Sequence, residues 1–154
     1  MKTLYVLMLF CMASTAQAMD AFIGTWKLTS FKSMDTEASS PDMMLIMMEQ
    51  AESGIHYRSE TISKSRVVIA EYTAEYDGHL SLVTGNYGLM APVKLMRIDA
   101  HTVEATYIRG LQVVASSRRV LTDDETTMTI TTQTYDAERH ALTNVGVYRR
   151  VTDN

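Results

Sequence analysis

Histidine is the side chain in this sequence best suited to bind a metal ion or to act as a general base. The chain contains four: His56, His79, His101 and His140. No two of them have the i, i+2 or i, i+4 spacing that puts two ligands on one face of a strand or helix. His79 and His101 also lie beside predicted turns, where solvated histidines are ordinary. The sequence therefore predicts no metal site and no cofactor.

Nucleophiles and carboxylates give no catalytic pattern either. The sequence lacks the Gly-x-Ser-x-Gly motif of a nucleophile elbow and any glycine-rich phosphate loop. Its two acid-rich stretches, Asp123-Asp124-Glu125 and Asp136-Ala137-Glu138, both fall in predicted turns. Solvated acids are more common there than paired catalytic carboxylates. We therefore predict that the protein is not an enzyme and has no catalytic residues.

Methionine is unusually frequent, and four of the twelve methionines lie at positions 43, 44, 47 and 48. Their flexible, polarizable side chains suit a surface that adapts to varied apolar partners, but they also fill ordinary cores. Copper binding through thioethers is a third interpretation, which the absence of histidine from the cluster disfavours.

The composition is that of one globular domain. The chain has 154 residues, is 46% hydrophobic and 21% charged, and carries a formal net charge of −4. It is too apolar for intrinsic disorder and too acidic for general electrostatic attraction to nucleic acid. We expect no nucleic-acid partner.

The first 18 residues are typical of a secretory signal peptide. Lys2 precedes an apolar run over 4–12, and Ala16-Gln17-Ala18 has the small-x-small pattern of a cleavage site. The run is too short to span a bilayer as a helix; the alternative is a buried N-terminal strand. The predicted organisation is a signal peptide, 1–18, followed by one domain, 19–154.

The predicted cleavage also determines the cysteine chemistry. The chain has one cysteine, Cys11, which lies inside the signal and follows Phe10 rather than the small residue that a lipoprotein requires. We therefore expect an exported protein, periplasmic or extracellular, with no membrane anchor and no disulfide.

The elements that must position any functional side chain are nearly all strands. Runs rich in β-branched and aromatic residues alternate with turn signals about every ten residues, which indicates an antiparallel sandwich or barrel. Asp77-Gly78 is a strong hairpin signal at the end of the run 66–76. Residues 43–50 contain good helix formers and could form a lid helix, but the run is short and leads into Glu52-Ser53-Gly54. We favour a strand.

The stretch after the predicted cleavage site resembles the opening strand of the calycins, the lipocalin and fatty-acid-binding superfamily. Its Gly-x-Trp motif is matched by Gly24 and Trp26, and Arg149 and Arg150 offer the basic residue of the last strand. The resemblance implies a small antiparallel up-and-down β-barrel, in which Trp26 packs at the closed end beneath one of these arginines. The alternative is a core tryptophan in an unrelated β-protein.

A closer resemblance is to secreted bacterial proteins described as lipocalin-like. It is carried by the stretches 71–78, 83–85, 95–106, 118–120 and 127–131. It implies the same barrel, supports a strand at 43–50, and implies no particular ligand.

The sequence departs from fatty-acid-binding proteins at a residue that binds ligand in that family. Those proteins carry an arginine two residues before a tyrosine on the last strand, and the pair clamps a carboxylate. Here the tyrosine is Tyr148, but Gly146 stands in the arginine position. The resemblance therefore implies a ligand held by burial rather than by a charged clamp.

Strand alternation predicts which side chains face the interior, because successive residues point to opposite faces. On the last strand, alternation turns Val145 and Val147 inward, whereas the resemblance turns Tyr148 inward. The predicted lining set is Val68, Tyr72, Val103, Tyr107, Val113, Met128, Ile130 and Tyr148. We expect non-catalytic binding of a small apolar or amphipathic molecule of unknown identity. The alternative is a solid-cored barrel that acts as a structural or protein-interaction domain. The sequence predicts no oligomeric state.

Overall fold

A computed structural model describes residues 19–34, 40–64 and 66–152. The predicted signal peptide, with Cys11, lies outside these ranges. Every regular element within them is a strand. The strands are β1 Gly24–Ser33, β2 Met43–Gln50, β3 Ile55–Ser63, β4 Arg66–Ala74, β5 Asp77–Ser81, β6 Thr84–Gly85, β7 Gly88–Leu89, β8 Val93–Asp99, β9 Thr102–Arg109, β10 Gln112–Leu121, β11 Thr127–Tyr135 and β12 Ala141–Arg150. No helix in this part of the chain has the length and apolar character needed to cross a bilayer.

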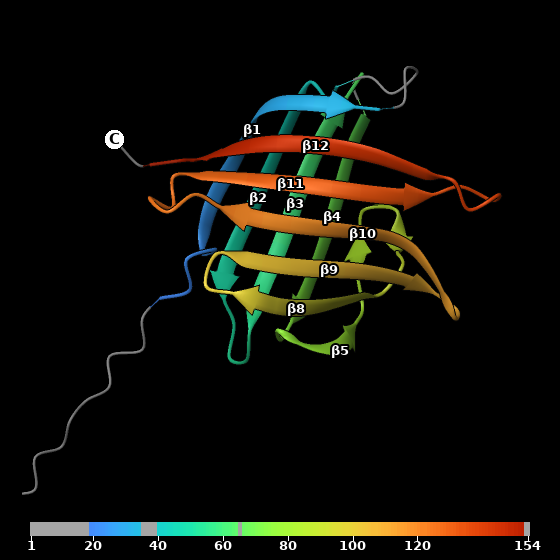
Figure 1. The fold of residues 1–154 in the computed structure, drawn as a ribbon, viewed down its shortest axis with the longest axis horizontal. Helices are drawn as coiled ribbons and strands as arrows, with labels where there is room; N and C mark the ends of the chain where they lie inside the picture. Colours follow the sequence, from blue (N-terminus) through green and yellow to red (C-terminus); the bar gives the residue numbers. More distant parts are fainter. Residues whose placement is uncertain (1–18, 35–39, 65, 153–154) are drawn as a thin grey trace, which may run out of the picture.

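The strands form one curled antiparallel sheet. Its order is β5-β8-β9-β10-β11-β12-β1-β2-β3-β4-β6-β7, so most strands pair with their neighbours in the chain. In Figure 1, strands β8 to β12 form the front layer, and β2 to β4 cross behind them at a steep angle. The sheet curls so that its two layers face each other, as in a barrel. The fold is all-β and antiparallel, as predicted.

Strand β1 connects the two layers because it bends (Figure 1). It pairs with β12 on one side and with β2 on the other, and its register with β12 shifts between Leu28 and Ser30. A bulge of this kind bends a strand and increases its twist. The register shift thus allows one strand to belong to both layers.

The segment 43–50 is the strand β2, which confirms the strand prediction over the lid helix. Its methionines divide between the faces: Met48 is in the core, whereas Met43 and Met47 are half-buried. The hydrophobic run on both faces explains why periodicity could not decide between helix and strand.

The hairpin predicted at Asp77-Gly78 is wrong. Strand β4 ends before it, and β5 pairs with β8 instead of β4. The dipeptide makes a local turn within β5: the Asp77 carboxylate accepts the backbone N–H of His79 at 2.9 Å, and Gly78 has a φ of +81°. Positive φ suits glycine, but here it produces an irregular strand start rather than a reversal. The sheet remains open between β4 and β5.

The closed end of the barrel is built around Trp26, which is fully buried. The Arg150 guanidinium carbon lies 4.3 Å from the centre of the indole ring, and Arg150 also donates to the carbonyls of Ala21 and Glu125. A Cβ at Gly24 would lie 2.7 Å from the Arg150 side chain, and Gly24 has a φ of +138°. Glycine is therefore needed here for the arginine to reach the tryptophan. Of the two arginines considered, Arg150 occupies this place and Arg149 is exposed.

Candidate ligand-binding cavity

A cavity of about 550 Å³ lies between the two layers. Side chains of β2, β3 and β4 line one side, and side chains of β9 to β12 line the other. The segment 83–91, which contains the short strands β6 and β7, borders the cavity where it opens to solvent. Its volume is in the range of small-molecule sites, about 300–1,000 Å³. We call the open end, away from Trp26, the mouth.

The cavity contains one charged side chain that is buried, Arg119 of β10. It is only 3% exposed. One guanidinium nitrogen donates to the Tyr72 hydroxyl at 2.7 Å, and the guanidinium carbon lies 4.6 Å from the centre of the Tyr57 ring. The two tyrosine rings are stacked, with centroids 4.7 Å apart. Arg119 thus crosses from the front layer to the aromatic pair of the back layer.

Arg119 has no carboxylate partner among the described residues. Its Nε atom is buried and makes no hydrogen bond there. Other arginines of the sheet are paired with acids: Arg58 with Glu71 at 3.0 Å, and Arg118 with Glu104 at 2.5 Å. A buried charge without a counter-charge is costly, so this side chain is the exception that calls for a functional explanation.

The tyrosines around Arg119 do not neutralise its charge. Burial raises the pKa of Tyr57 to about 12 and the pKa of Tyr72 well above its usual value, despite the opposing effect of the nearby arginine. Both hydroxyls therefore stay protonated at neutral pH. Burial opposes the charged form of Arg119, but a guanidinium keeps its proton in proteins even where it is buried. The guanidinium remains a cation, and the cavity has positive potential.

Tyr148 of β12 supplies a further hydroxyl. Its side chain is 4% exposed, its hydroxyl donates to the Met44 sulfur at 3.1 Å, and burial raises its pKa. The ring lies over Gly146: a Cβ there would come within 2.8 Å of it. The Tyr148 ring thus fills the space beside Gly146, the position at which fatty-acid-binding proteins carry the clamp arginine. The inward orientation of Tyr148 follows the resemblance and not simple alternation.

The structure brings half of the predicted lining residues to the cavity and not the others. Tyr72, Tyr107, Ile130 and Tyr148 line it. Val103 and Met128 are buried at 1% and 0% exposure, in the packed core and outside the lining. Both side chains point to the interior of the barrel, as predicted, but they lie in the part of the interior that is packed solid.

Two further residues of the predicted set are displaced from the cavity. Val68 is half-buried near the start of β4, outside the lining. Val114 lines the cavity in place of Val113, because the register of β10 against β9 shifts between Val113 and Ala115. A one-residue shift moves a side chain to the other face. The alternation rule failed here because it assumed an uninterrupted strand.

Arg119 and Tyr57 are the most consequential of the lining residues that are absent from the predicted set. Arg119 follows Ala115 and Ser117 at intervals of two, and all three line the cavity. The periodic signal was therefore present in the sequence. It was not used because a charged residue is expected on the solvent face.

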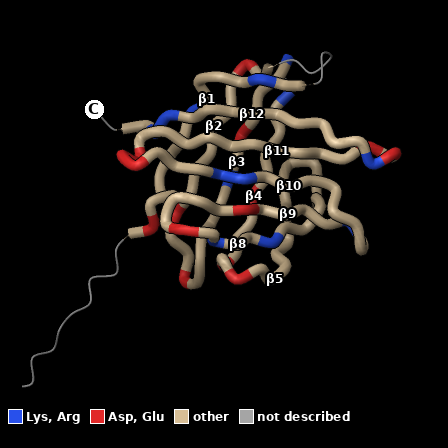
Figure 2. The backbone as a smooth tube through the Cα atoms, in the orientation of Figure 1, with Lys and Arg blue, Asp and Glu red and all other residues tan. Residues whose placement is uncertain are grey.

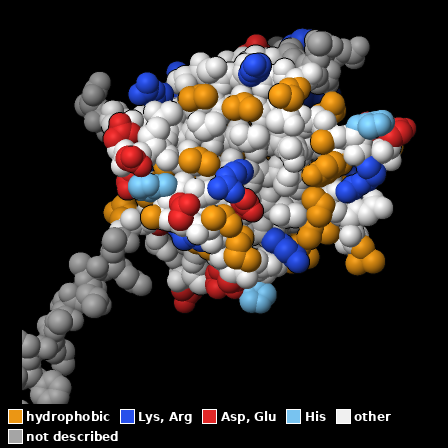
Figure 3. Space-filling model, in the orientation of Figure 1, with side chains coloured by type: hydrophobic (Ala, Val, Ile, Leu, Met, Phe, Trp, Pro, Cys, Tyr) orange, Lys and Arg blue, Asp and Glu red, His pale blue; other side chains and the backbone are white. Residues whose placement is uncertain are grey.

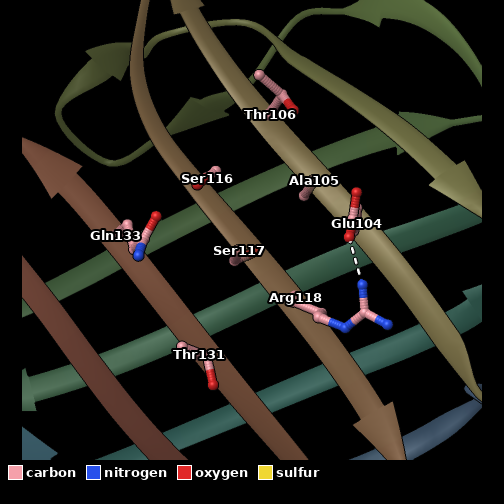
Figure 4. A pocket seen from close by; sticks show the side chains of 8 residues that line it. All are labelled: Glu104, Ala105, Thr106, Ser116, Ser117, Arg118, Thr131 and Gln133. Atoms are coloured by element: carbon pink, nitrogen blue, oxygen red, sulfur yellow. Dashed lines mark hydrogen bonds and ion pairs between the residues drawn. The ribbon is translucent and has the colours of Figure 1, made fainter. Parts of the chain in front are cut away.

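Two other hollows lie outside the barrel interior. One, of about 350 Å³, lies on β9, β10 and β11, where Glu104 and Arg118 pair with each other (Figure 4). The other, of about 920 Å³, lies at the closed end, where Arg97 pairs with Asp20 and lies over the Tyr76 ring at 3.9 Å. Because these arginines are paired, neither hollow offers the uncompensated charge of the interior cavity.

Three exposed ligand-type side chains meet in the turn between β11 and β12. Ligand atoms of Asp136, Glu138 and His140 lie within 4.8 Å of one another. Asp136 accepts the backbone N–H of His140 at 2.7 Å and contacts its ring at 3.1 Å. These bonds account for the arrangement as a turn. The prediction of no metal site stays a prediction.

Comparison with known proteins identifies the fold. No family model matches the sequence, and no curated protein matches it. Among solved structures, the zebrafish ileal bile acid-binding protein in complex with cholic acid is similar, with a TM-score of 0.58 and 12% sequence identity. The match covers 85% of this chain and 99% of the zebrafish chain. It shows that the chain has an antiparallel barrel of the calycin type.

Proposed function

We propose that the protein is a non-catalytic, exported binder of a small amphipathic molecule, and that the acidic head group of this molecule lies against Arg119. The observation that carries the proposal is the buried guanidinium without a carboxylate partner among the described residues. An anionic oxygen beside it would receive charge-assisted hydrogen bonds, each about 1.5–3 kcal/mol. The ligand would thereby supply the counter-charge that the chain itself lacks.

The rest of the cavity fits the apolar part of such a molecule. The lining also contains Met90, Leu89, Tyr107 and Tyr87, and Ile130 lies beside Arg119 on the neighbouring strand. Burying apolar surface contributes roughly 25 cal/mol per Å² before ordering costs. A head group at Arg119 and a tail toward the mouth would therefore satisfy both parts of the site.

The proposal changes the expectation of a ligand held by burial alone. The carboxylate clamp of the last strand is incomplete at Gly146, but a cation enters the same interior from β10. The zebrafish protein of similar fold was solved with cholic acid, an amphipathic acid. That ligand supports the chemical class proposed here. The cavity also disfavours the alternative of a solid-cored interaction domain.

The test compares an acid with its uncharged ester. Affinities of the purified protein for a dansyl-labelled fatty acid and for its methyl ester are measured by fluorescence titration. We expect the acid to bind at least about tenfold more tightly, which corresponds to about 1.4 kcal/mol. Arg119→Met should abolish this preference, because it removes the charge and keeps a side chain of similar length.

Arg118→Met is the matched control. Arg118 precedes Arg119 but pairs with Glu104 on the outer face, with about half of its side chain exposed. This variant should keep the preference for the acid. Equal wild-type affinities for acid and ester, or an undiminished preference in Arg119→Met, would show that the head group does not bind here.

A further inference from the structure

Large apolar side chains are exposed around the mouth. Leu82, Leu89 and Leu111 are 65%, 69% and 103% exposed, and Tyr87 is 65% exposed. They lie on two loops at the same end of the barrel, the segment between β5 and β8 and the turn between β9 and β10. Figure 3 shows hydrophobic side chains gathered at the right-hand side of the molecule, where this end lies. A cluster of this kind marks an interaction surface.

Basic side chains without acidic partners lie at the same end. Lys64 lies in the turn between β3 and β4, Arg66 begins β4, and Arg109 ends β9. None of the three forms an ion pair with another described residue, whereas Arg58, Arg97 and Arg118 do so elsewhere on the sheet. The acids described at this end are Asp42, Asp136 and Glu138.

The closed end has the opposite charge. Its turns contain Asp20, Glu52 and the run 123–125, and Asp99 ends β8 beside them. Arginines also lie at this end: Arg97 pairs with Asp20, and Arg150 lies over Trp26. In Figure 2, Asp and Glu are concentrated along the left and lower edges, where the closed end lies. An anionic surface would repel the acidic turns of the closed end more than the mouth, so the protein would meet such a surface with the mouth toward it.

We propose that the mouth docks on an anionic lipid bilayer, with Leu82, Tyr87, Leu89 and Leu111 entering the interface and Lys64, Arg66 and Arg109 facing the head groups. Apolar loop tips around an opening, bordered by cations, fit the plane of a bilayer interface. Tyrosine is favoured at that depth, and each cation strengthens adsorption to an anionic surface roughly fivefold. For a protein that binds an amphiphile, as proposed above, this orientation joins the cavity to the membrane that dissolves the ligand.

The experiment uses vesicles of phosphatidylcholine alone and with about 30% phosphatidylglycerol, an anionic content sufficient for electrostatic adsorption. The full chain without its predicted signal is co-sedimented with each at about 0.1 M and about 0.5 M salt. We expect at least about fivefold more binding to the anionic vesicles at low salt, and loss of this excess at high salt. No binding, or equal binding to both compositions, would overturn the proposal.

Two double variants remove the two components of the surface without changing the cavity lining. Leu82→Ser with Leu111→Ser should lower binding to anionic vesicles at least about fivefold. Lys64→Glu with Arg66→Glu should abolish the preference for phosphatidylglycerol. Ile98→Ser is the control, because Ile98 is 48% exposed on β8 near the closed end, and it should bind as wild type. Unchanged binding in either double variant would overturn the proposal.

Two further measurements distinguish bilayer docking from head-group binding and from self-association. The acid-over-ester preference in vesicle-free buffer should be unchanged in Leu82→Ser with Leu111→Ser, so failure of docking and failure of head-group binding are distinguishable. Analytical ultracentrifugation tests whether the same face pairs with a second copy of the chain. A dimer that this double variant dissociates would overturn the bilayer as the partner.

Discussion

Arg119→Met should make the protein more stable while it removes the preference for acidic ligands. The guanidinium is 3% exposed and has no carboxylate partner among the described residues. The desolvation cost of such an ion is several kcal/mol. Against this, the variant loses the cation–π contact with Tyr57, about 1–2 kcal/mol, and the hydrogen bond to the Tyr72 hydroxyl, about 1.5–3 kcal/mol. Methionine fills much of the vacated volume.

The desolvation term is the larger, so we expect a net stabilisation of about 1–2 kcal/mol and a rise in Tm of roughly 3–8 °C. The assay is urea unfolding and calorimetry of ligand-free protein, with Arg118→Met as control. That control removes a partly exposed ion pair and should change stability by no more than about 0.5 kcal/mol. A loss of more than about 1 kcal/mol in Arg119→Met would refute the reasoning, because it would make Arg119 a structural residue whose charge is satisfied without a ligand.

Three other measurements follow from the structure. Trp26→Ala should lower the free energy of unfolding by about 3–5 kcal/mol in urea denaturation, because a fully buried indole and its contact with Arg150 are lost; a near-wild-type midpoint would contradict its place at the closed end. The pKa of Tyr57, raised from 10.0 to about 12, favours the folded state below pH 10, and this contribution is lost as pH rises to about 12. Tyr57→Phe should therefore lose less stability than wild type between those pH values, by about 2–3 kcal/mol, and an identical pH dependence would argue against burial of this hydroxyl. Mass spectrometry of exported protein should find an N-terminus at Met19, and a retained, lipid-modified Cys11 would contradict the predicted cleavage site and the predicted absence of a membrane anchor.

The sequence predicts the strands well because local signals determine them. Residues 43–50 form a strand despite their helix propensity, and the short connections to the next strand supply the deciding information. The pairing of strands is less predictable. Asp77-Gly78 has the local chemistry of a hairpin, but β5 pairs with β8, with Asp77 opposite Met96 and Ser81 opposite Val93. Pairing across that distance depends on the curl of the whole sheet.

Strand alternation predicts which side chains point into the barrel, but it does not predict whether they line the cavity or belong to the packed core. Tyr107 and Val103 share one face of β9, yet Tyr107 lines the cavity and Val103 belongs to the packed core. The difference depends on which side chains of the opposite layer meet them, and no local pattern contains that information. The bulge beside Val113 is likewise set by the pairing of β10 with β9.

Gly146 and the buried Arg119 together show that an inward-facing cation can lie on a strand other than the last one. A motif such as arginine-x-tyrosine on the last strand places two groups in one chain segment. A cavity requires only that a cation and hydroxyls point into the same space, because their effect on an anion depends on distance and burial. Each strand of a curled sheet directs every second residue into that space. Arg119 on β10, Tyr57 on β3 and Tyr148 on β12 therefore converge there, although they are far apart in the chain. A sequence motif detects only residues that are close together on one strand. The chemistry of the cavity depends on the inward-facing residues of all the strands.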